Sequence, residues 1–250
     1  MAFWCLVLAQ ILLVDMTSFP RFYAILLSLL LMTTALTTHA GRAENAANRV
    51  LPALERDAKG LNLQVGAPVF IRIFKHDAVL ELWLKGAQRY ALFRSYPICA
   101  YSGGLGPKTM EGDGQAPEGI YQVSLKQMNP ASRFHLSFNL GYPNAYDQAH
   151  GYTGSALMVH GNCVSIGCYA MTDAKIEEIY TLMARAFVAG QASIPVHAFP
   201  FRLTKDALVE NSKQPFIDFW QELAPIYQAF EDDSMPPKVR VQGGHYRIVE

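Results

Sequence analysis

The segment His160-Gly161-Asn162-Cys163-Val164-Ser165-Ile166-Gly167-Cys168-Tyr169 decides how the rest of this chain is interpreted. It places a histidine, two glycines, a serine and two cysteines within ten residues. The apolar run 156–159 before it predicts a buried strand, and Thr172 with Asp173 after it predicts a capped helix start. A thiol held between a strand end and a helix, with a histidine nearby, is suited to nucleophilic catalysis.

In the nucleophile interpretation, Cys168 attacks a carbonyl carbon and His160 acts as the general base. Backbone amides around Gly167 and Cys168 would form the oxyanion hole, and a helix starting near Thr172 would favour a thiolate. This interpretation is the preferred one, because it explains why a His-Gly pair, a Ser-x-Gly-Cys run and a long aromatic loop converge.

Two other interpretations of the segment stay open. A zinc site would use His150, His160, Cys163 and Cys168, but their spacings are irregular and no C-x-x-C pair is present. In the second interpretation, the segment is a turn held by a disulfide, and its histidine has only a structural role.

The cysteine count bears on these alternatives. After removal of an export segment containing Cys5, the chain keeps Cys99, Cys163 and Cys168. Because three is odd and export exposes thiols to oxidation, one disulfide plus one functional thiol is the economical solution. We prefer a Cys99–Cys163 pair with Cys168 free. Three reduced, buried cysteines are the first alternative, and a Cys163–Cys168 pair, which would disable the nucleophile, is the second.

The N-terminus has the layout of a secretory signal. Arg21 precedes the apolar run 24–36, and small residues ending in Ala40 follow it. We therefore predict a signal peptide over residues 1–40, with Met16 as an alternative start, and an exported mature chain. A membrane anchor is the competing interpretation, but the run is shorter than the roughly 20 residues that a span needs.

Composition limits the class of protein. The 250 residues include 21 Lys+Arg and 21 Asp+Glu, and this balance argues against a nucleic-acid-binding protein. Roughly 200 mature residues suit one domain with an appendage. We predict a leader over 41–67, a catalytic domain over 68–203 and a C-terminal extension over 204–250. The extension should contain a helical part with a kink at Pro225 and a hairpin turning at Gly243-Gly244.

Hydrophobic periodicity indicates a mainly β, α+β domain with one core helix over 172–187. The first three strands are short and closely spaced, which predicts an antiparallel meander, and the last is expected to be an edge or final strand. The expected strands are 69–74, 79–84, 90–96, 120–123 and 194–199.

Residues 126–155 show almost no periodicity, and so long a loop within a compact domain is usually functional. We expect its aromatic, amide and acidic side chains to line a polar substrate groove, with a plain surface excursion as the alternative. The candidate groove residues are Tyr142, Asn144, Tyr146, Asp147 and His150.

His160-Gly161 followed by Ser165-x-Gly167-Cys168 resembles the signature of the YkuD-type L,D-transpeptidase catalytic domain, and the match spans roughly residues 68–199. Gly103-Gly104 with Pro117-x-Gly119 is similar to that family's glycine loop and strand start. The runs 101–108, 142–147 and 164–171 resemble its YafK-like branch.

The resemblance implies a β-sandwich-type catalytic domain and a periplasmic thiol enzyme acting on peptidoglycan stem peptides, without a cofactor or metal. By position it makes Cys168 the nucleophile and His160 the base. The Gly161 carbonyl would orient the histidine, Ser165 would support the loop, and Gly167 would shape the oxyanion hole.

This sequence departs from the family in two places. Only three residues separate His-Gly from Ser-x-Gly-Cys, where the family commonly has many. Tyr169 and Ala170 follow the cysteine, where the family commonly has an arginine that is a candidate for gripping a substrate carboxylate. Lys108 and Arg133 are weaker candidates for that grip, and Tyr169 is a candidate substrate contact.

Typical members attack a tetrapeptide at the diaminopimelate–D-alanine bond and pass the acyl group to an amine. The YafK-like branch is associated with water as the acceptor and with detachment of an outer-membrane lipoprotein. The resemblance therefore predicts hydrolysis of the diaminopimelate–lysine link. The alternatives are a transpeptidase that forms cross-links or attaches lipoprotein, and a non-catalytic peptidoglycan-binding module.

Overall fold

The computed structural model describes residues 41–249, and the chain from Arg42 onward forms one compact unit. The predicted signal peptide and the alternative start at Met16 lie outside the described residues. No helix within 41–249 combines the length and the hydropathy needed to cross a membrane.

The first sheet has five strands in the order β3-β2-β1-β10-β5. The predicted meander is present as antiparallel pairs of β1 with β2 and β2 with β3. Strand β10 pairs in parallel with β1 and antiparallel with β5, so it lies inside the sheet rather than at its edge. The strand bounds are β1 Val69–Phe74, β2 Val79–Lys85, β3 Tyr90–Pro97, β5 Gly119–Val123 and β10 Ile194–Phe199.

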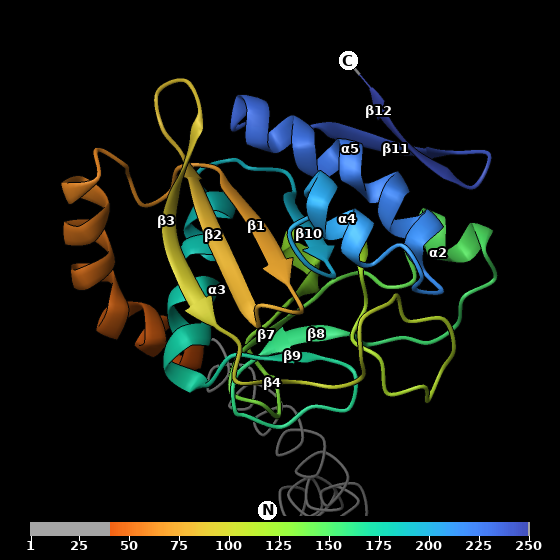
Figure 1. Ribbon diagram of the computed structural model, residues 1–250. Helices are drawn as coiled ribbons and strands as arrows, with labels where there is room; N and C mark the ends of the chain where they lie inside the picture. Colours follow the sequence, from red (N-terminus) through yellow and green to blue (C-terminus); the bar gives the residue numbers. More distant parts are fainter. Residues whose placement is uncertain (1–40, 250) are drawn as a thin grey trace, which may run out of the picture. The chain divides into compact units, whose positions relative to one another are not determined.

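Strand β1 is buried on both faces, because a helix covers each side of this sheet. Val69, Ile71 and Ile73 belong to a core that also contains the apolar side of α3 (Asp173–Val188). The alternate residues Phe70 and Phe74 face α5 (Ile217–Asp233), through ring contacts with its aromatic side chains. Figure 1 shows α3 behind β1–β3 and α5 beside β1.

The second sheet carries the segment that opened the sequence analysis. Its order is β4-β9-β8-β7-β6, and β8 and β9 are parallel. Helix α3 contacts β1 of the first sheet and β7 and β8 of the second. Two mixed sheets sharing one core helix give an α+β fold, which confirms the predicted fold class. The bounds are β4 Ala100–Tyr101, β6 Met128–Asn129, β7 Ser137–Asn139, β8 Met158–His160 and β9 Tyr169–Ala170.

The prediction of a structureless loop over 126–155 is wrong. This region contains a 3-10 turn (Leu125–Gln127), β6, β7 and the short helix α2 (Ala145–Ala149). Side chains that bond the local backbone build these elements. Asn144 Oδ1 accepts from the Asp147 amide, and Asp147 accepts in return from the Asn144 amide, which is a reciprocal cap.

Both ends of the compact unit pack on the sheets. Residues 42–60 form a helix whose Ala46, Leu54 and Ala58 join the main core, so the expected leader contributes buried side chains. The C-terminal part contains α4 (Lys205–Glu210), α5 with Pro225 inside it, and the hairpin of β11 (Lys238–Gln242) and β12 (His245–Val249). Gly243 and Gly244 form the two-residue turn of this hairpin. Their φ values of +59° and +80° match the turn type in which both central residues have positive φ.

Candidate active site

Two adjacent parallel strands bring His160 and Cys168 to the same pocket. His160 ends β8 opposite Ala170, and Cys168 directly precedes β9. Residues two apart on a strand point to one face, so Cys168 and Ala170 share the face of His160. The two side chains line a pocket of about 260 Å³ together with Phe134, Val164, Ser165 and Ile166.

His160 is almost fully buried, and its ring is held from two sides. Nδ1 lies 2.5 Å from the Gly161 carbonyl oxygen, and the Phe134 ring centroid lies 4.5 Å from that of the imidazole. A carbonyl accepts only, so Nδ1 carries the proton and Nε2 has a free lone pair. Burial lowers the pKa of His160. The glycine is required sterically, since a Cβ at Gly161 would lie 2.7 Å from the Phe134 carbonyl oxygen.

Cys168 is the free thiol of the described residues and is half-buried. Its Sγ lies 3.4 Å from the Met158 amide nitrogen and 3.9 Å from the Ala156 carbonyl oxygen. Burial raises the pKa of the thiol, and the Met158 amide partly opposes that rise. A raised thiol pKa beside a lowered imidazole pKa gives a neutral pair at rest. Attack by a neutral thiol requires a general base, which is the role predicted for His160.

Ser165 holds the turn that presents the thiol. Its Oγ donates to the Cys168 carbonyl oxygen at 2.7 Å and accepts from the amides of Cys168 and Gly167 at 2.9 and 3.2 Å. Those two amides are the predicted oxyanion donors, and in this structure both are bonded to Ser165. Gly167 has a φ of +138°, which disfavours any side chain there.

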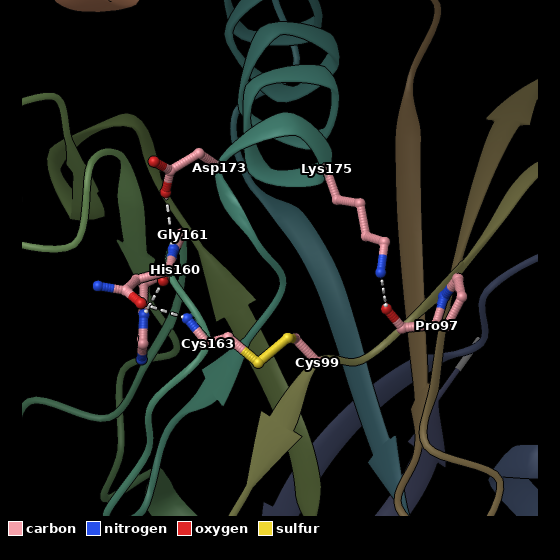
Figure 2. The surroundings of a disulfide bond; sticks show 8 residues. Pro97, Cys99, His160, Gly161, Cys163, Asp173 and Lys175 are labelled. Carbon is pink, nitrogen blue, oxygen red and sulfur yellow. Dashed lines mark hydrogen bonds between the residues drawn. A yellow bond between two sulfur atoms is a disulfide. The ribbon is translucent and has the colours of Figure 1, made fainter.

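The linker between His160 and Cys168 is anchored at its centre. A disulfide joins Cys163 to Cys99 across a Cα–Cα distance of 5.4 Å, which is the pairing preferred from the thiol count (Figure 2). The Asn162 amide donates to Asp173 Oδ1 at 2.7 Å. Cys163 is therefore not a free thiolate, which removes one of the four ligands of the zinc interpretation.

The start of α3 differs from expectation in one detail. Thr172 is the N-cap residue, but its side chain makes no capping bond and its φ is +74°. Asp173 instead uses its carboxylate to hold the linker through Asn162. The helix start thus positions the His160–Cys168 linker, while the thiol itself contacts backbone near β8.

The five predicted groove residues are not among those that line the pocket of Cys168, and their role in substrate binding stays a prediction. They build α2 and pack it against the C-terminal hairpin. Tyr146 stacks on Tyr246 and on His150, with ring centroids 4.6 and 4.1 Å apart. Asn144 Nδ2 donates to Tyr246 Oη and the Ile120 carbonyl oxygen, both at 2.9 Å.

Tyr142 and Asp147, from the same set of five residues, also make contacts within the fold. Tyr142 donates to the Lys108 carbonyl oxygen at 3.1 Å, and the buried Asp147 lies 3.3 Å from the Tyr121 hydroxyl. Burial raises the pKa of Asp147 to about 6. Polar side chains that bond the local backbone have the same sequence appearance as ligand-binding ones, so sequence alone does not separate the two roles.

Lys108 and Tyr169 are likewise committed within the fold. Lys108 Nζ lies 2.6 Å from Asp113 Oδ1 and 2.8 Å from the Met110 carbonyl oxygen. Tyr169 is fully buried and donates to the Pro117 carbonyl oxygen at 2.6 Å. Neither side chain is free to grip a substrate carboxylate, and the exposed Arg133 is not among the residues that line the pocket.

Phe134, Val164 and Ile166 are pocket residues that sequence reasoning missed. Val164 and Ile166 flank Ser165 within the segment 160–169, and their apolar character is evident from the sequence. Their exposure could not be predicted, because an apolar residue in a short linker is ordinarily expected to be buried.

Residues 68–196 match the L,D-transpeptidase catalytic domain, YkuD. With a free cysteine and a buried histidine in one pocket, the chain belongs to this family of cysteine-nucleophile enzymes, which act on peptidoglycan peptides.

The chain is 49% identical over 184 residues to the candidate L,D-transpeptidase YafK of Escherichia coli (strain K12), covering 74% of this chain and 75% of that protein. Two solved structures are more distant. The helical cell shape determining protein Pgp2 from Campylobacter jejuni has a TM-score of 0.44 at 17% identity, covering 70% of this chain and 73% of that chain. Bd1075 from Bdellovibrio bacteriovorus has a TM-score of 0.37 at 19% identity, covering 66% and 57%.

Proposed function

We propose that this chain is a periplasmic cysteine hydrolase that cleaves the diaminopimelate–lysine link between peptidoglycan and an outer-membrane lipoprotein. The observation that carries the proposal is the free thiol of Cys168 in one pocket with the buried His160, on a fold of the L,D-transpeptidase family. The resemblance of the run 164–171 to the YafK-like branch supports water as the acceptor.

The first half of the reaction transfers the acyl group to sulfur. His160 Nε2 takes the thiol proton, and Cys168 Sγ attacks the diaminopimelate carbonyl carbon. The carbon–nitrogen bond to lysine then breaks, and His160 returns the proton to the leaving amine. The amides of Gly167 and Cys168 stabilise the oxyanion after exchanging the Ser165 hydroxyl for the substrate oxygen.

The second half releases the peptide. Water attacks the thioester carbon while His160 accepts a proton, and the Cys168 thiolate leaves and is protonated again. An L,D-transpeptidase uses the same acyl-thioenzyme and differs only in admitting an amine as the acceptor. Transpeptidation, as in the name of the YafK relative, is therefore the second candidate function.

The test is incubation of the purified mature chain with sacculi that carry covalently bound lipoprotein, followed by mass spectrometry of the products. Hydrolysis releases lipoprotein with an unmodified terminal lysine and leaves a tripeptide on the glycan. New peptide dimers, or lipoprotein newly attached to free stem peptides, would assign the transpeptidase instead.

Cys168→Ala is the matched variant for this assay, and it should release no lipoprotein. Full activity in Cys168→Ala would reject the mechanism. If neither protein forms any product and both sediment equally with sacculi, the chain is a peptidoglycan-binding module. Osmotic-shock fractionation of cells that express the full chain tests the periplasmic location.

A further inference from the structure

Two large apolar side chains stand exposed beside the nucleophile. Ile166 is 93% exposed and Val164 is 55% exposed, and both belong to the linker that carries Cys168. With Phe134 they form the apolar part of the wall of the Cys168 pocket. Exposed apolar surface continuous with a reactive group is typical of a substrate contact.

The same pocket has no cationic wall among the described residues. Its lining contains His160, whose pKa burial lowers, and neither lysine nor arginine. The position at which the family commonly has an arginine holds Tyr169 and Ala170, and both are buried in the sheet. The candidate Lys108 is bonded to Asp113. A carboxylate placed in this pocket would therefore find neither lysine nor arginine among the lining residues.

The two possible leaving groups, D-alanine and a lysine side chain, differ in whether a carboxylate lies next to the scissile bond. A diaminopimelate carbonyl is the acyl half of both the tetrapeptide and the lipoprotein-linked substrate. D-alanine carries its carboxylate one carbon from the nitrogen of the scissile bond. A lysine bound through its side-chain amine carries four methylene groups there instead, and a methylene stem is stabilised by apolar walls.

We infer that Phe134, Val164 and Ile166 form a leaving-group subsite for the methylene stem of a lysine side chain. The inference rests on the proposed function and adds a specificity determinant to it. The pocket, at about 260 Å³, is smaller than the roughly 300 to 1,000 Å³ typical of sites for larger ligands, which suits a short chain.

The test uses synthetic substrates with one acyl half and a graded leaving group. The leaving residue is attached through a side-chain amine that bears two, three or four methylenes: diaminobutyrate, ornithine or lysine. For the wild-type protein, kcat/KM should rise with each methylene by up to about fourfold, the effect of burying one such group. In Ile166→Ser and Val164→Ser this rise should flatten.

Matched controls are Val188→Ser and Val209→Ser, which change valines outside this pocket whose exposures, 83% and 72%, lie between those of Val164 and Ile166. They should keep the wild-type slope. All four positions are exposed, so the substitutions should leave folding intact, which circular dichroism checks.

Each outcome decides a different point. If Ile166→Ser lowers all three rates equally, these side chains bind the acyl half, and the leaving-group assignment is overturned. An unchanged slope overturns it as well, even when the wild-type protein hydrolyses the lysyl substrate. A wild-type protein that releases D-alanine from tetrapeptides but no side-chain amine overturns the proposed function together with this inference.

Discussion

At the scale of single residues, burial sets the charge states of the proposed catalytic pair, Cys168 and His160. The pKa of Cys168 is raised and that of His160 is lowered, in both cases chiefly by burial. Both groups are therefore uncharged near neutral pH, unlike a thiolate–imidazolium pair, in which the thiolate already exists before substrate binds. Phe134 and the Gly161 carbonyl hold the imidazole, so its orientation does not depend on a charged partner.

This arrangement predicts the pH dependence of the thiol. Iodoacetamide should alkylate Cys168 slowly at pH 7, and the rate should climb above pH 9, where the thiolate forms. Hydrolysis should lose activity only below pH 6.5, because the lowered pKa keeps His160 unprotonated above that value. An alkylation rate that is already maximal at pH 6 would instead indicate a thiolate–imidazolium pair.

His197 predicts a second pH effect, on stability. Both of its ring nitrogens are buried without a partner, between Phe70 and Phe199. Burial, with a contribution from the Arg72 charge, lowers its pKa to about 3. The unfolded chain binds a proton below about pH 6.5 whereas the folded chain does not until about 3. The free energy of unfolding is therefore unaffected by His197 above pH 6.5, and it falls as the pH drops below that value, because only the unfolded chain then binds the proton.

His197→Leu should remove this part of the acid sensitivity, which is on the order of 5 kcal/mol between those two values. The measurement is the free energy of unfolding in urea at a series of pH values, compared with wild type. His76→Leu, which removes an exposed imidazole, is the control for the substitution itself. Parallel curves for His197→Leu and wild type would show that His197 binds its proton equally well in the folded and the unfolded chain, and would reject the prediction.

At the scale of elements, the linker between β8 and β9 depends on its disulfide. Cys99 and Cys163 are 64 residues apart in sequence, so the bond closes a long loop in the unfolded chain. Removing it as Cys99→Ser with Cys163→Ser should lower the free energy of unfolding by about 2–4 kcal/mol. Urea unfolding in a Cys168→Ala background measures this without thiol exchange. Dithiothreitol should lower the free energy of unfolding of the Cys168→Ala parent, which keeps the disulfide. It should leave that of the variant without the disulfide unchanged.

Elements with a clear period were predictable, and elements built by side-chain capping were not. The meander 69–97 and the Gly243-Gly244 hairpin follow from alternation and turn chemistry, which are local. Helix α2 depends on the Asn144–Asp147 reciprocal cap and on stacking against Tyr246, a residue about a hundred positions away. The linker was recognised by its residue types, but the exposure of Ile166 depends on the surrounding fold.

At the scale of the whole unit, the C-terminal part is a structural layer rather than an appendage. Trp220 of α5 is fully buried and its Nε1 donates to Glu118 Oε2 at 2.9 Å. Glu118 also pairs with the buried Lys75 at 3.0 Å and accepts from the Gly106 amide at 2.7 Å. Helix α5 thereby supports the glycine loop and the first sheet together.

Truncation after residue 203 should therefore prevent folding, because it exposes the apolar face of β1 and β10 and leaves the Lys75–Glu118 pair without its indole donor. Soluble yield and near-ultraviolet circular dichroism of residues 41–203 measure this. A shorter deletion of residues 238–250 keeps α5 and should fold with a lower melting temperature. A well-folded 41–203 fragment would show that the α5 layer is dispensable.

The way in which His160 and Cys168 are held has an evolutionary consequence. Each member is fixed in the sheet by its own strand, His160 by β8 and Cys168 by β9, and the strands pair directly. The part of the stretch before Ser165 can therefore change in length while Ser165 keeps its bonds to the Cys168 turn. In this chain the stretch is short, exposes Val164 and Ile166, and is tethered by Cys163. Mutations at those two exposed positions would change the surface beside the pocket while leaving the strands that hold His160 and Cys168 in place, so specificity could evolve separately from the proposed catalytic pair.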